Sequence, residues 1–358
     1  MHLPATAVQL ASEDRPKTRH PSCVLHPSTH PCRLAPHMKP PPLAHSILNA
    51  IGNTPLLELH QLQRSLAFQG RILLKLEYLS PGGSKKDRVA KEILSEAISA
   101  KRLLPGQPVV ELTSGNTGTG LAIACAALGH PFIAVMSRGN SVERARMMES
   151  LGAEVVLVDQ ATDFAPGQVS GADLALVETE TTRICSERRA FRADQFHNLA
   201  NRLAHERHTG PEIWEQSSGD IDAFVDFAGT AGSFTGVSRA LKLRNPSIRC
   251  YLAEPTGAAT LSGQTASEPR HPIQGGGYAM QDLPLLDRSL ISKFVQVSGD
   301  DSRDAMRRLA RTEGVFGGFS TGANLAAALQ LLHSHEKGST IVIIACDSGM
   351  KYLSTDLF

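Results

Sequence analysis

Gly83-Ser84-Lys85-Lys86-Asp87-Arg88 places two adjacent lysines in a turn of small residues, between a predicted strand and a predicted helix. Thr113-Ser114-Gly115-Asn116-Thr117-Gly118 forms a second turn of small polar residues, directly after another predicted strand. A lysine amine forms an imine with an aldehyde when it is desolvated or lies near another cation. Backbone N–H groups at the start of a helix bind anions. Together the two turns predict an enzyme that holds an aldehyde-bearing ligand beside an anion.

Strands and helices alternate on both sides of these turns, from Ser46 onward. The predicted strands are Arg71–Leu76, Val109–Glu111, Pro131–Met136, Glu154–Val158, Ala223–Phe227, Ile248–Ala253 and Thr340–Ala345. The predicted helices follow Lys86, cover Gly118–Leu128 and Gly322–Leu332, run from a capping box of Asn140 and Glu143 to Leu151, and run from Gly229–Ser233 to Lys242. This alternation is typical of parallel sheets covered by helices on both faces.

The expected fold class is therefore α/β, with two open, twisted, mostly parallel sheets and an active site between two domains. We expect an N-terminal domain over 46–200, whose smaller, mobile part covers about 90–195. We expect a C-terminal domain over 201–358, to which residues 46–88 contribute. The glycine-rich turns all follow strands, so they are expected to converge on one cleft at the carboxyl ends of the strands.

Composition excludes several classes of protein. The chain has 358 residues, of which 41% are hydrophobic and 20% charged, and its net charge is +1, so no basic surface for nucleic acid is expected. No apolar run approaches the roughly 20 residues of a membrane-spanning helix. The six cysteines include no CxxC pair, which favours reduced thiols and a cytoplasmic protein.

Residues 1–45 have a different composition, rich in Pro, His, Ser and Thr without helical or strand periodicity. We expect this N-terminal tail to be disordered. Cys23, His26, His30 and Cys32 lie close enough in sequence to suggest a metal or haem site. Incidental His and Cys in a disordered tail is the favoured interpretation, so no metal is expected.

Lys86 is the candidate nucleophile, because Lys85 and Arg88 are cations near it in sequence and would lower the pKa of its amine. The alternative is that Lys85 and Lys86 are solvated charges at a helix start, although positive charge there opposes the helix dipole. Gly229-Thr230-Ala231-Gly232-Ser233 also enters a predicted helix, and its glycines and hydroxyls suit a phosphate. A tight turn without a ligand explains that segment equally well.

Six motifs, taken in order, resemble those of the cysteine synthase and cystathionine β-synthase family of fold-type-II pyridoxal-phosphate enzymes. They are GGSKKDR, ELTSGNTGTGLA, DQFHNLAN, GTAGS, GVFGGFSTGAN and DSGMKYLST. The resemblance extends from Ser46 to Phe358 and implies pyridoxal 5'-phosphate as the cofactor. It also implies a homodimer that acts on a small amino-acid substrate and a small nucleophile, without nucleic acid or membrane as a partner.

The resemblance implies a role for each motif. Lys86 is expected to be the Schiff-base lysine, and Asn116 to contact the ring hydroxyl of the cofactor. The phosphate is expected to bind Gly229, Thr230, Ala231, Gly232 and Ser233, and the substrate carboxylate to bind Thr113, Ser114, Gly115, Thr117 and Gln195. Ser348 is expected to face the pyridine nitrogen, with the neighbouring Asp347 as the alternative.

The sequence departs from the family pattern at Ala231, where glycine is common, and in the Ile273–Tyr278 loop on the nucleophile side. The implied reaction is β-replacement on an O-activated serine such as O-acetylserine, with sulfide or another thiol or amine as the nucleophile. The alternatives are a serine or threonine dehydratase-type lyase, the use of serine and homocysteine as in cystathionine β-synthase, and a binding protein that has kept the fold.

Overall fold

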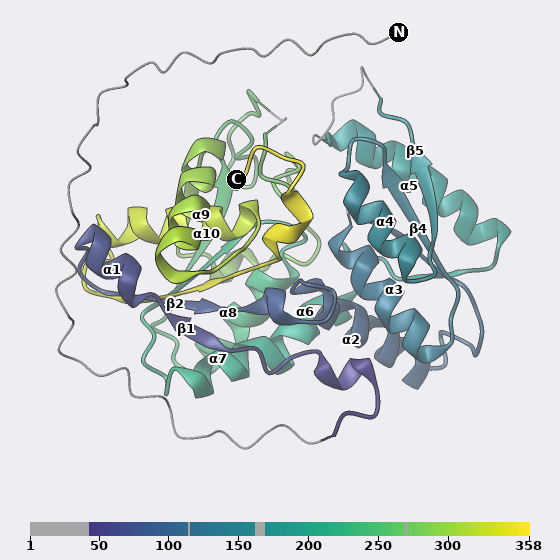
Figure 1. Ribbon diagram of the computed structural model, residues 1–358, viewed down its shortest axis with the longest axis horizontal. Coiled ribbons are helices and arrows are strands. Elements are labelled where there is room, and N and C mark those ends of the chain that lie inside the picture. The colour runs from purple at the N-terminus through teal and green to yellow at the C-terminus, as the bar shows by residue number, and fades with distance from the viewer. Residues whose placement is uncertain (1–42, 114, 162–168, 269–270) are drawn as a thin grey trace, which may run out of the picture. The chain divides into compact units, whose positions relative to one another are not determined.

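The computed structural model describes residues 43–358, except Ser114, residues 162–168 and residues 269–270. The ten strands of this described part form two sheets (Figure 1). The larger sheet has the order β1 (Leu56–Glu58), β2 (Arg71–Lys75), β10 (Thr340–Ile344), β7 (Ala223–Phe227), β8 (Arg249–Pro255) and β9 (Lys293–Val297). The smaller sheet has the order β5 (Glu154–Val158), β4 (Phe132–Ser137), β3 (Val109–Leu112) and β6 (Phe191–Arg192).

All strand pairs are parallel except β1 with β2, which confirms the predicted α/β class. β1 and β2 come early in the chain, yet β2 pairs in register with β10 near its end, from Arg71 opposite Thr340 to Lys75 opposite Ile344. The larger sheet thus takes its first two strands, β1 and β2, from residues 56–75. Residues 109–192 supply all four strands of the smaller sheet. The mobility expected of residues 90–195 stays a prediction.

Helices connect the strands. They are α1 (His60–Leu66), α2 (Lys86–Ser99), α3 (Asn116–Leu128), α4 (Val142–Ser150), α5 (Gly171–Glu187), α6 (Leu199–Ala204), α7 (Gly210–Gln216), α8 (Gly232–Arg244), α9 (Gly299–Glu313) and α10 (Phe319–Leu332). A π-helical turn, His205–Thr209, joins α6 to α7, and short 3₁₀ turns cover Ile47–Ala50, Glu77–Leu79, Arg288–Leu290 and Gly349–Tyr352. The expected capping box of Asn140 and Glu143 is wrong: Ser141 precedes α4, and its side chain makes no capping hydrogen bond.

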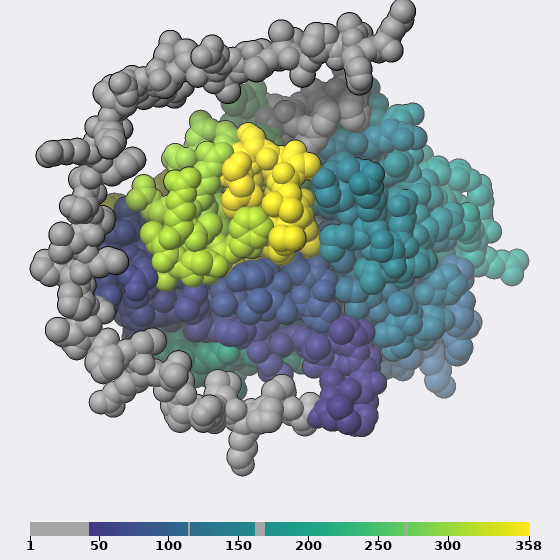
Figure 2. All heavy atoms as spheres, viewed as in Figure 1, coloured from purple at the N-terminus to yellow at the C-terminus, as the bar shows by residue number. Residues whose placement is uncertain are grey.

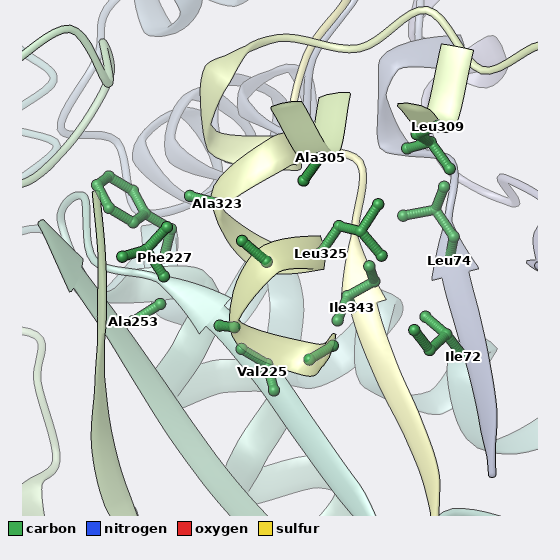
Figure 3. Packing of buried hydrophobic residues seen from close by; sticks show 14 of the residues in the cluster. Ile72, Leu74, Val225, Phe227, Ala253, Ala305, Leu309, Ala323, Leu325 and Ile343 are labelled. Carbon is green, nitrogen blue, oxygen red and sulfur yellow. The ribbon is translucent and has the colours of Figure 1, made fainter. Parts of the chain in front are cut away.

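The core of the larger sheet follows from the two-residue period of its strands. Ile343 of β10 and Val225 of β7 face α9 and α10, where they meet residues such as Ala305 and Leu325 (Figure 3). Ile341 of β10 belongs to the same apolar cluster. The intervening residues Val342, Ile344 and Phe224 belong to the apolar cluster on the opposite face, with Phe234 and Val237 of α8. Helices cover both faces of the sheet at β10, so every residue of this strand is buried, which explains its almost entirely apolar sequence, TIVII.

Candidate active site

The lysine turn lies between β2 and α2 and is bonded to the chain beyond β10. The backbone N–H of Lys85 donates to the Cys346 carbonyl (2.8 Å), and Ser84 forms an antiparallel bridge with Asp347. The buried Asp87 carboxylate accepts the Gly82 N–H (2.5 Å), and burial raises the pKa of this carboxyl to about 6. Since α2 begins at Lys86, its first turn presents the Lys86 side chain at the ends of the strands.

The Lys86 amine is desolvated, and the interpretation of Lys85 and Lys86 as solvated charges is wrong. Burial, with the positive charge of Lys85 next in importance, lowers the pKa of Lys86 to about 7. Its Nζ lies 3.2 Å from Thr230 Oγ1. Lys85 is also withdrawn from solvent, with 11% of its side chain exposed. Arg88 turns away and pairs with Glu77 and Glu212, each at 2.6 Å.

The Gly229–Ser233 turn joins β7 to α8 and directs the first N–H groups of α8 toward the ends of the strands. Thr230 Oγ1 accepts a hydrogen bond from Asn201 Nδ2 (2.9 Å) in addition to its contact with Lys86. A Cβ at Gly232 would come within 2.2 Å of Asn201 Oδ1, so this close approach requires glycine. Ala231 adopts a left-handed conformation, with φ of 62°, which favours glycine over other residues.

A hollow that is open to solvent lies around Lys86. Its described lining comes mainly from the turns and helix starts that follow β2, β3, β7 and β10. The lining residues are Lys85, Lys86, Asn116, Phe227, Gly229, Thr230, Ser233, Gly275, Ser320 and Cys346. The structure thus brings Lys86, Asn116 and most of the expected phosphate turn together around one space.

The Thr113–Gly118 turn joins β3 to α3. Thr113 Oγ1 accepts hydrogen bonds from the Gly115 N–H (3.0 Å) and the Gly118 N–H (2.8 Å), so this side chain shapes the turn from within. Gly115 has φ of 123°, and a Cβ there would come within 2.4 Å of the Arg144 side chain. Ser114 lies outside the described residues.

Gln195 meets this turn from the chain beyond β6. Thr117 Oγ1 donates to Gln195 Oε1 (2.5 Å), and Gln195 Nε2 donates to the Leu112 carbonyl (2.9 Å). The carboxylate of Glu111, buried in β3, accepts the N–H groups of Asp194 (2.6 Å) and Gln195 (3.2 Å). Burial raises the pKa of Glu111 to about 7. Gln195 is therefore fixed by both its side chain and its backbone.

Asn116 links the start of α3 to the C-terminal segment. Its Nδ2 donates to Asp347 Oδ2 (2.6 Å), and its Oδ1 accepts from Lys351 Nζ (2.8 Å). Tyr352 donates its hydroxyl to the same Asp347 oxygen (2.6 Å), and burial lowers the pKa of Lys351 to about 8. Figure 2 shows the C-terminal residues in yellow at the surface between the yellow-green atoms of α9 and the blue-teal atoms of earlier residues. The Asn116 amide is thus oriented by charged neighbours on both of its polar atoms.

Ser348 and Asp347 are both absent from the described lining of the hollow. Ser348 Oγ accepts the Met350 N–H (3.3 Å) and caps the 3₁₀ turn Gly349–Tyr352. Asp347 is 1% exposed and is engaged by Asn116 and Tyr352. The polar groups that line the hollow from the C-terminal part of the chain are Ser320, at the start of α10, and Cys346, just after β10.

Sequence reasoning did not include four residues of this region among its candidates: Lys85 and Ser320, which line the hollow, and Asn201 and Asp226, which bond to residues that line it. Lys85 was treated only as a neighbouring charge, yet its Nζ lies 2.8 Å from Ser233 Oγ and 3.0 Å from Asp226 Oδ1. Asn201 and Ser320 lie inside two of the quoted motifs, DQFHNLAN and GVFGGFSTGAN, which was an available signal. Asp226 was visible only as a charged residue inside a predicted buried strand.

The residues present fit pyridoxal phosphate. Three features suited to this cofactor lie at one hollow. They are a desolvated amine for the aldehyde, a helix start with two hydroxyls for the phosphate, and Gly232, a position without room for a Cβ. No group of three or more His, Cys, Asp or Glu side chains within the described ranges is placed to hold a metal ion. Cys23, His26, His30 and Cys32 fall outside those ranges. None of the described helices has the length and apolar character to cross a membrane.

Comparison with known proteins gives consistent matches. The family described as "Pyridoxal-phosphate dependent enzyme" matches residues 47–347. Cysteine synthase 3 of Caenorhabditis elegans is 40% identical over 313 residues, which are 87% of this chain and 88% of the relative. O-ureido-L-serine synthase of Streptomyces lavendulae is 38% identical over 319 residues, covering 88% of this chain and 93% of the relative. The crystal structure of cysteine synthase from Entamoeba histolytica superimposes with a TM-score of 0.83 at 33% identity, covering 91% of this chain and 94% of that one.

Proposed function

The chain belongs to the pyridoxal-phosphate-dependent enzymes of the cysteine synthase type, and from this premise we propose that it catalyses β-replacement on O-acetylserine or a similar O-activated serine. In the proposed reaction sulfide, or another thiol or amine, replaces the group on Cβ. The observation that carries the proposal is the Lys86 amine, whose pKa is lowered to about 7 at the edge of a hollow lined by Thr230 and Ser233.

When bound, pyridoxal phosphate supplies an aldehyde that condenses with amines and a ring that withdraws electrons from Cα. Lys86 is the residue placed to hold the aldehyde carbon. With a pKa of about 7, a substantial fraction of the freed Lys86 amine would be neutral at neutral pH and could take up the Cα proton, as a general base of matched pKa does. We assign the phosphate to the N–H groups and hydroxyls of Gly229–Ser233.

The remaining assignments place the substrate and the ring. The turn that contains Gly115 and Thr117, together with Gln195, is proposed to bind the substrate carboxylate, because backbone N–H groups of a helix start and a fixed amide lie together there. We propose that Asn116 contacts the ring hydroxyl. Ser320 is a better candidate than Ser348 for the pyridine nitrogen, because Ser320 lines the hollow and Ser348 caps a neighbouring turn.

A substrate panel tests this proposal. The purified holoenzyme is expected to show visible absorbance from the lysine-bound cofactor, which shifts when O-acetylserine is added and returns when sulfide is added, with cysteine as the product. The panel also includes serine with homocysteine, and an oxygen nucleophile of the urea class, since one relative is named for O-ureido-L-serine. Pyruvate release without incorporation of any nucleophile would support the dehydratase-type alternative instead.

We further propose a cytoplasmic homodimer, as the resemblance implies. The four cysteines in the described part of the chain, Cys125, Cys185, Cys250 and Cys346, are free thiols, as they are in a reducing compartment. Light scattering on the purified protein tests the dimer, and imaging of the tagged full chain tests the location.

A further inference from the structure

A buried ion pair lies directly beside the phosphate turn. Lys85 Nζ is 3.0 Å and 3.1 Å from the two carboxylate oxygens of Asp226, and 2.8 Å from Ser233 Oγ. Ser233 in turn donates its hydroxyl to Asp226. Asp226 is fully buried in β7, whereas Lys85 and Ser233 line the hollow. Lys85 therefore contacts the buried carboxylate and also borders the hollow.

The pair has an electrostatic consequence for the turn. An isolated carboxylate in this position would repel a phosphate dianion, and a buried unpaired charge is costly in itself. Burial works against the charge on Lys85, but Asp226 outweighs this effect and raises the pKa of the Lys85 amine. Lys85 thus stays a cation, and its remaining side is directed to Ser233, the second residue of α8.

Other groups around Lys85 do not replace this cation. Asn324 Nδ2 approaches Asp226 Oδ1 at 3.4 Å, and it is neutral. Burial raises the pKa of the Cys346 thiol to about 11, so this neighbour is neutral as well. Lys86 is the other lysine that lines the hollow, and its lowered pKa and its role at the aldehyde leave Lys85 as the lysine suited to the phosphate.

We propose that Lys85 is the cation of the phosphate site, held in place by Asp226, and that it binds the cofactor phosphate next to Ser233. This proposal rests on the chain binding pyridoxal phosphate. Lys85 is a positioning residue for the reaction, because it anchors the phosphate end of the cofactor and leaves the chemistry to Lys86. An ammonium held in this geometry places a positive charge beside the phosphate, in addition to the N–H groups of α8, and the hydrogen that it gives to Ser233 Oγ is the one that a phosphate oxygen next to Ser233 would take over.

The test compares two ligands that differ only in the phosphate. Apoproteins are titrated with pyridoxal phosphate and with pyridoxal, and the ratio of the two dissociation constants is taken from the visible absorbance of the lysine-bound ligand. In Lys85→Met, we expect the preference for the phosphorylated ligand to fall about tenfold or more. Any change at the Lys86 amine affects pyridoxal and pyridoxal phosphate alike, so the ratio isolates the contact to the phosphate.

A double variant separates phosphate binding from simple neutralisation of Asp226. Lys85→Met/Asp226→Asn removes both charges and should still show the reduced preference, whereas Asp226→Asn alone should keep a preference at or above that of the wild type. The matched control is Lys75→Met, which removes a fully buried lysine paired with Glu212 at 2.7 Å outside the hollow and should leave the ratio unchanged.

A wild-type ratio in the double variant would overturn the proposal, because Lys85 would then only neutralise Asp226. Inorganic phosphate gives an independent readout: it should raise the melting temperature of the wild-type apoprotein and have little effect on the double variant. If the wild type binds neither pyridoxal phosphate nor pyridoxal at Lys86, the assignment of the cofactor site itself fails, and this result is distinct from a changed ratio.

Discussion

Behind the Gly229–Ser233 turn lies the ion pair of Lys85 and Asp226, whereas behind the Thr113–Gly118 turn lies the neutral amide of Gln195. Both turns follow a parallel strand and open a helix, α8 or α3, so both offer N–H groups to an anion. The difference matches the anions that we assign to them. A phosphate with two charges stays bound throughout turnover, whereas a carboxylate with one charge must enter and leave in each cycle.

Removing Lys86 should have the largest effect, and it should leave both turns in place. Lys86→Ala eliminates the imine and the general base, so turnover should fall by at least about 10²–10⁴-fold. The phosphate turn should still bind pyridoxal phosphate, now reversibly and without the absorbance of the lysine-bound form. The measurement is cofactor content after gel filtration, alongside cysteine formation. Retained turnover in this variant would contradict the assignment of Lys86.

Weakening the carboxylate turn should separate substrate binding from cofactor binding. Thr117→Val removes the donor to Gln195 Oε1 and leaves a buried amide oxygen unpaired, which typically costs about 1–3 kcal/mol. We expect the KM for the amino-acid substrate to rise about tenfold, with cofactor affinity unchanged. Thr181→Val is the matched control, because Thr181 is a buried threonine of α5 whose hydroxyl bonds within its own helix. A loss of cofactor in Thr117→Val would argue against two separate anion sites.

The charge behind the phosphate turn should also set the pH dependence of cofactor loading. Lys86 feels Lys85, Asp226, Cys346 and Glu111, and burial together with Lys85 lowers its pKa to about 7. The neutral amine attacks the aldehyde, so the loading rate of the apoprotein should rise with pH through about 7 and then level off. An unshifted lysine would keep gaining rate to about pH 10.4.

Lys85→Met removes the largest charge that lowers this pKa, so the midpoint of loading should move to higher pH. Stopped-flow absorbance measures the loading rate in both proteins. Lys75→Met should keep the wild-type midpoint. A midpoint that does not move in Lys85→Met would show that burial alone sets the pKa of Lys86.

The fold was predictable where a strand was almost entirely apolar. β7 and β10 each carry one polar residue, Asp226 and Thr340, and their predicted bounds agree with the structure to within a residue. Helices α5 and α9 were missed, although each follows a capping box, Ser170 with Asp173 and Ser298 with Asp301. In α5 the apolar periodicity is weak, so the helix start signal was the usable information there. In α9 the apolar residues follow a clear helical period between charged residues, so both the capping box and the periodicity were available signals.

Site residues could be predicted where a short local motif indicated their role. They could not be predicted where the role depends on a partner that is distant in the sequence. Lys86 and Gly229–Ser233 could be proposed as site residues from local sequence, and Lys86, Gly229, Thr230 and Ser233 line one hollow in the structure. The pairing of Lys85 with Asp226 joins residues 141 positions apart and depends on how β7 lies beside the lysine turn. Ser320 and Ser348 both lie inside quoted motifs, GVFGGFSTGAN and DSGMKYLST, and only the position of α10 at the strand ends distinguishes Ser320 as a residue that lines the hollow.

Restoring glycine to the phosphate turn should have the smallest effect. Ala231 has φ of 62°, a conformation that costs a non-glycine residue roughly 1–2 kcal/mol. Ala231→Gly removes this strain but gives the unfolded chain more freedom, which costs about 0.5–1 kcal/mol. The net gain in the free energy of unfolding should therefore be about 0.5 kcal/mol, measured by urea unfolding of the apoprotein. Ala228→Gly, at a buried position beside the same turn without positive φ, should instead destabilise the protein. If both variants lose stability equally, the packing of the Ala231 methyl group outweighs the strain of its backbone. The surroundings of the turn, rather than the residue at position 231, would then determine the backbone conformation.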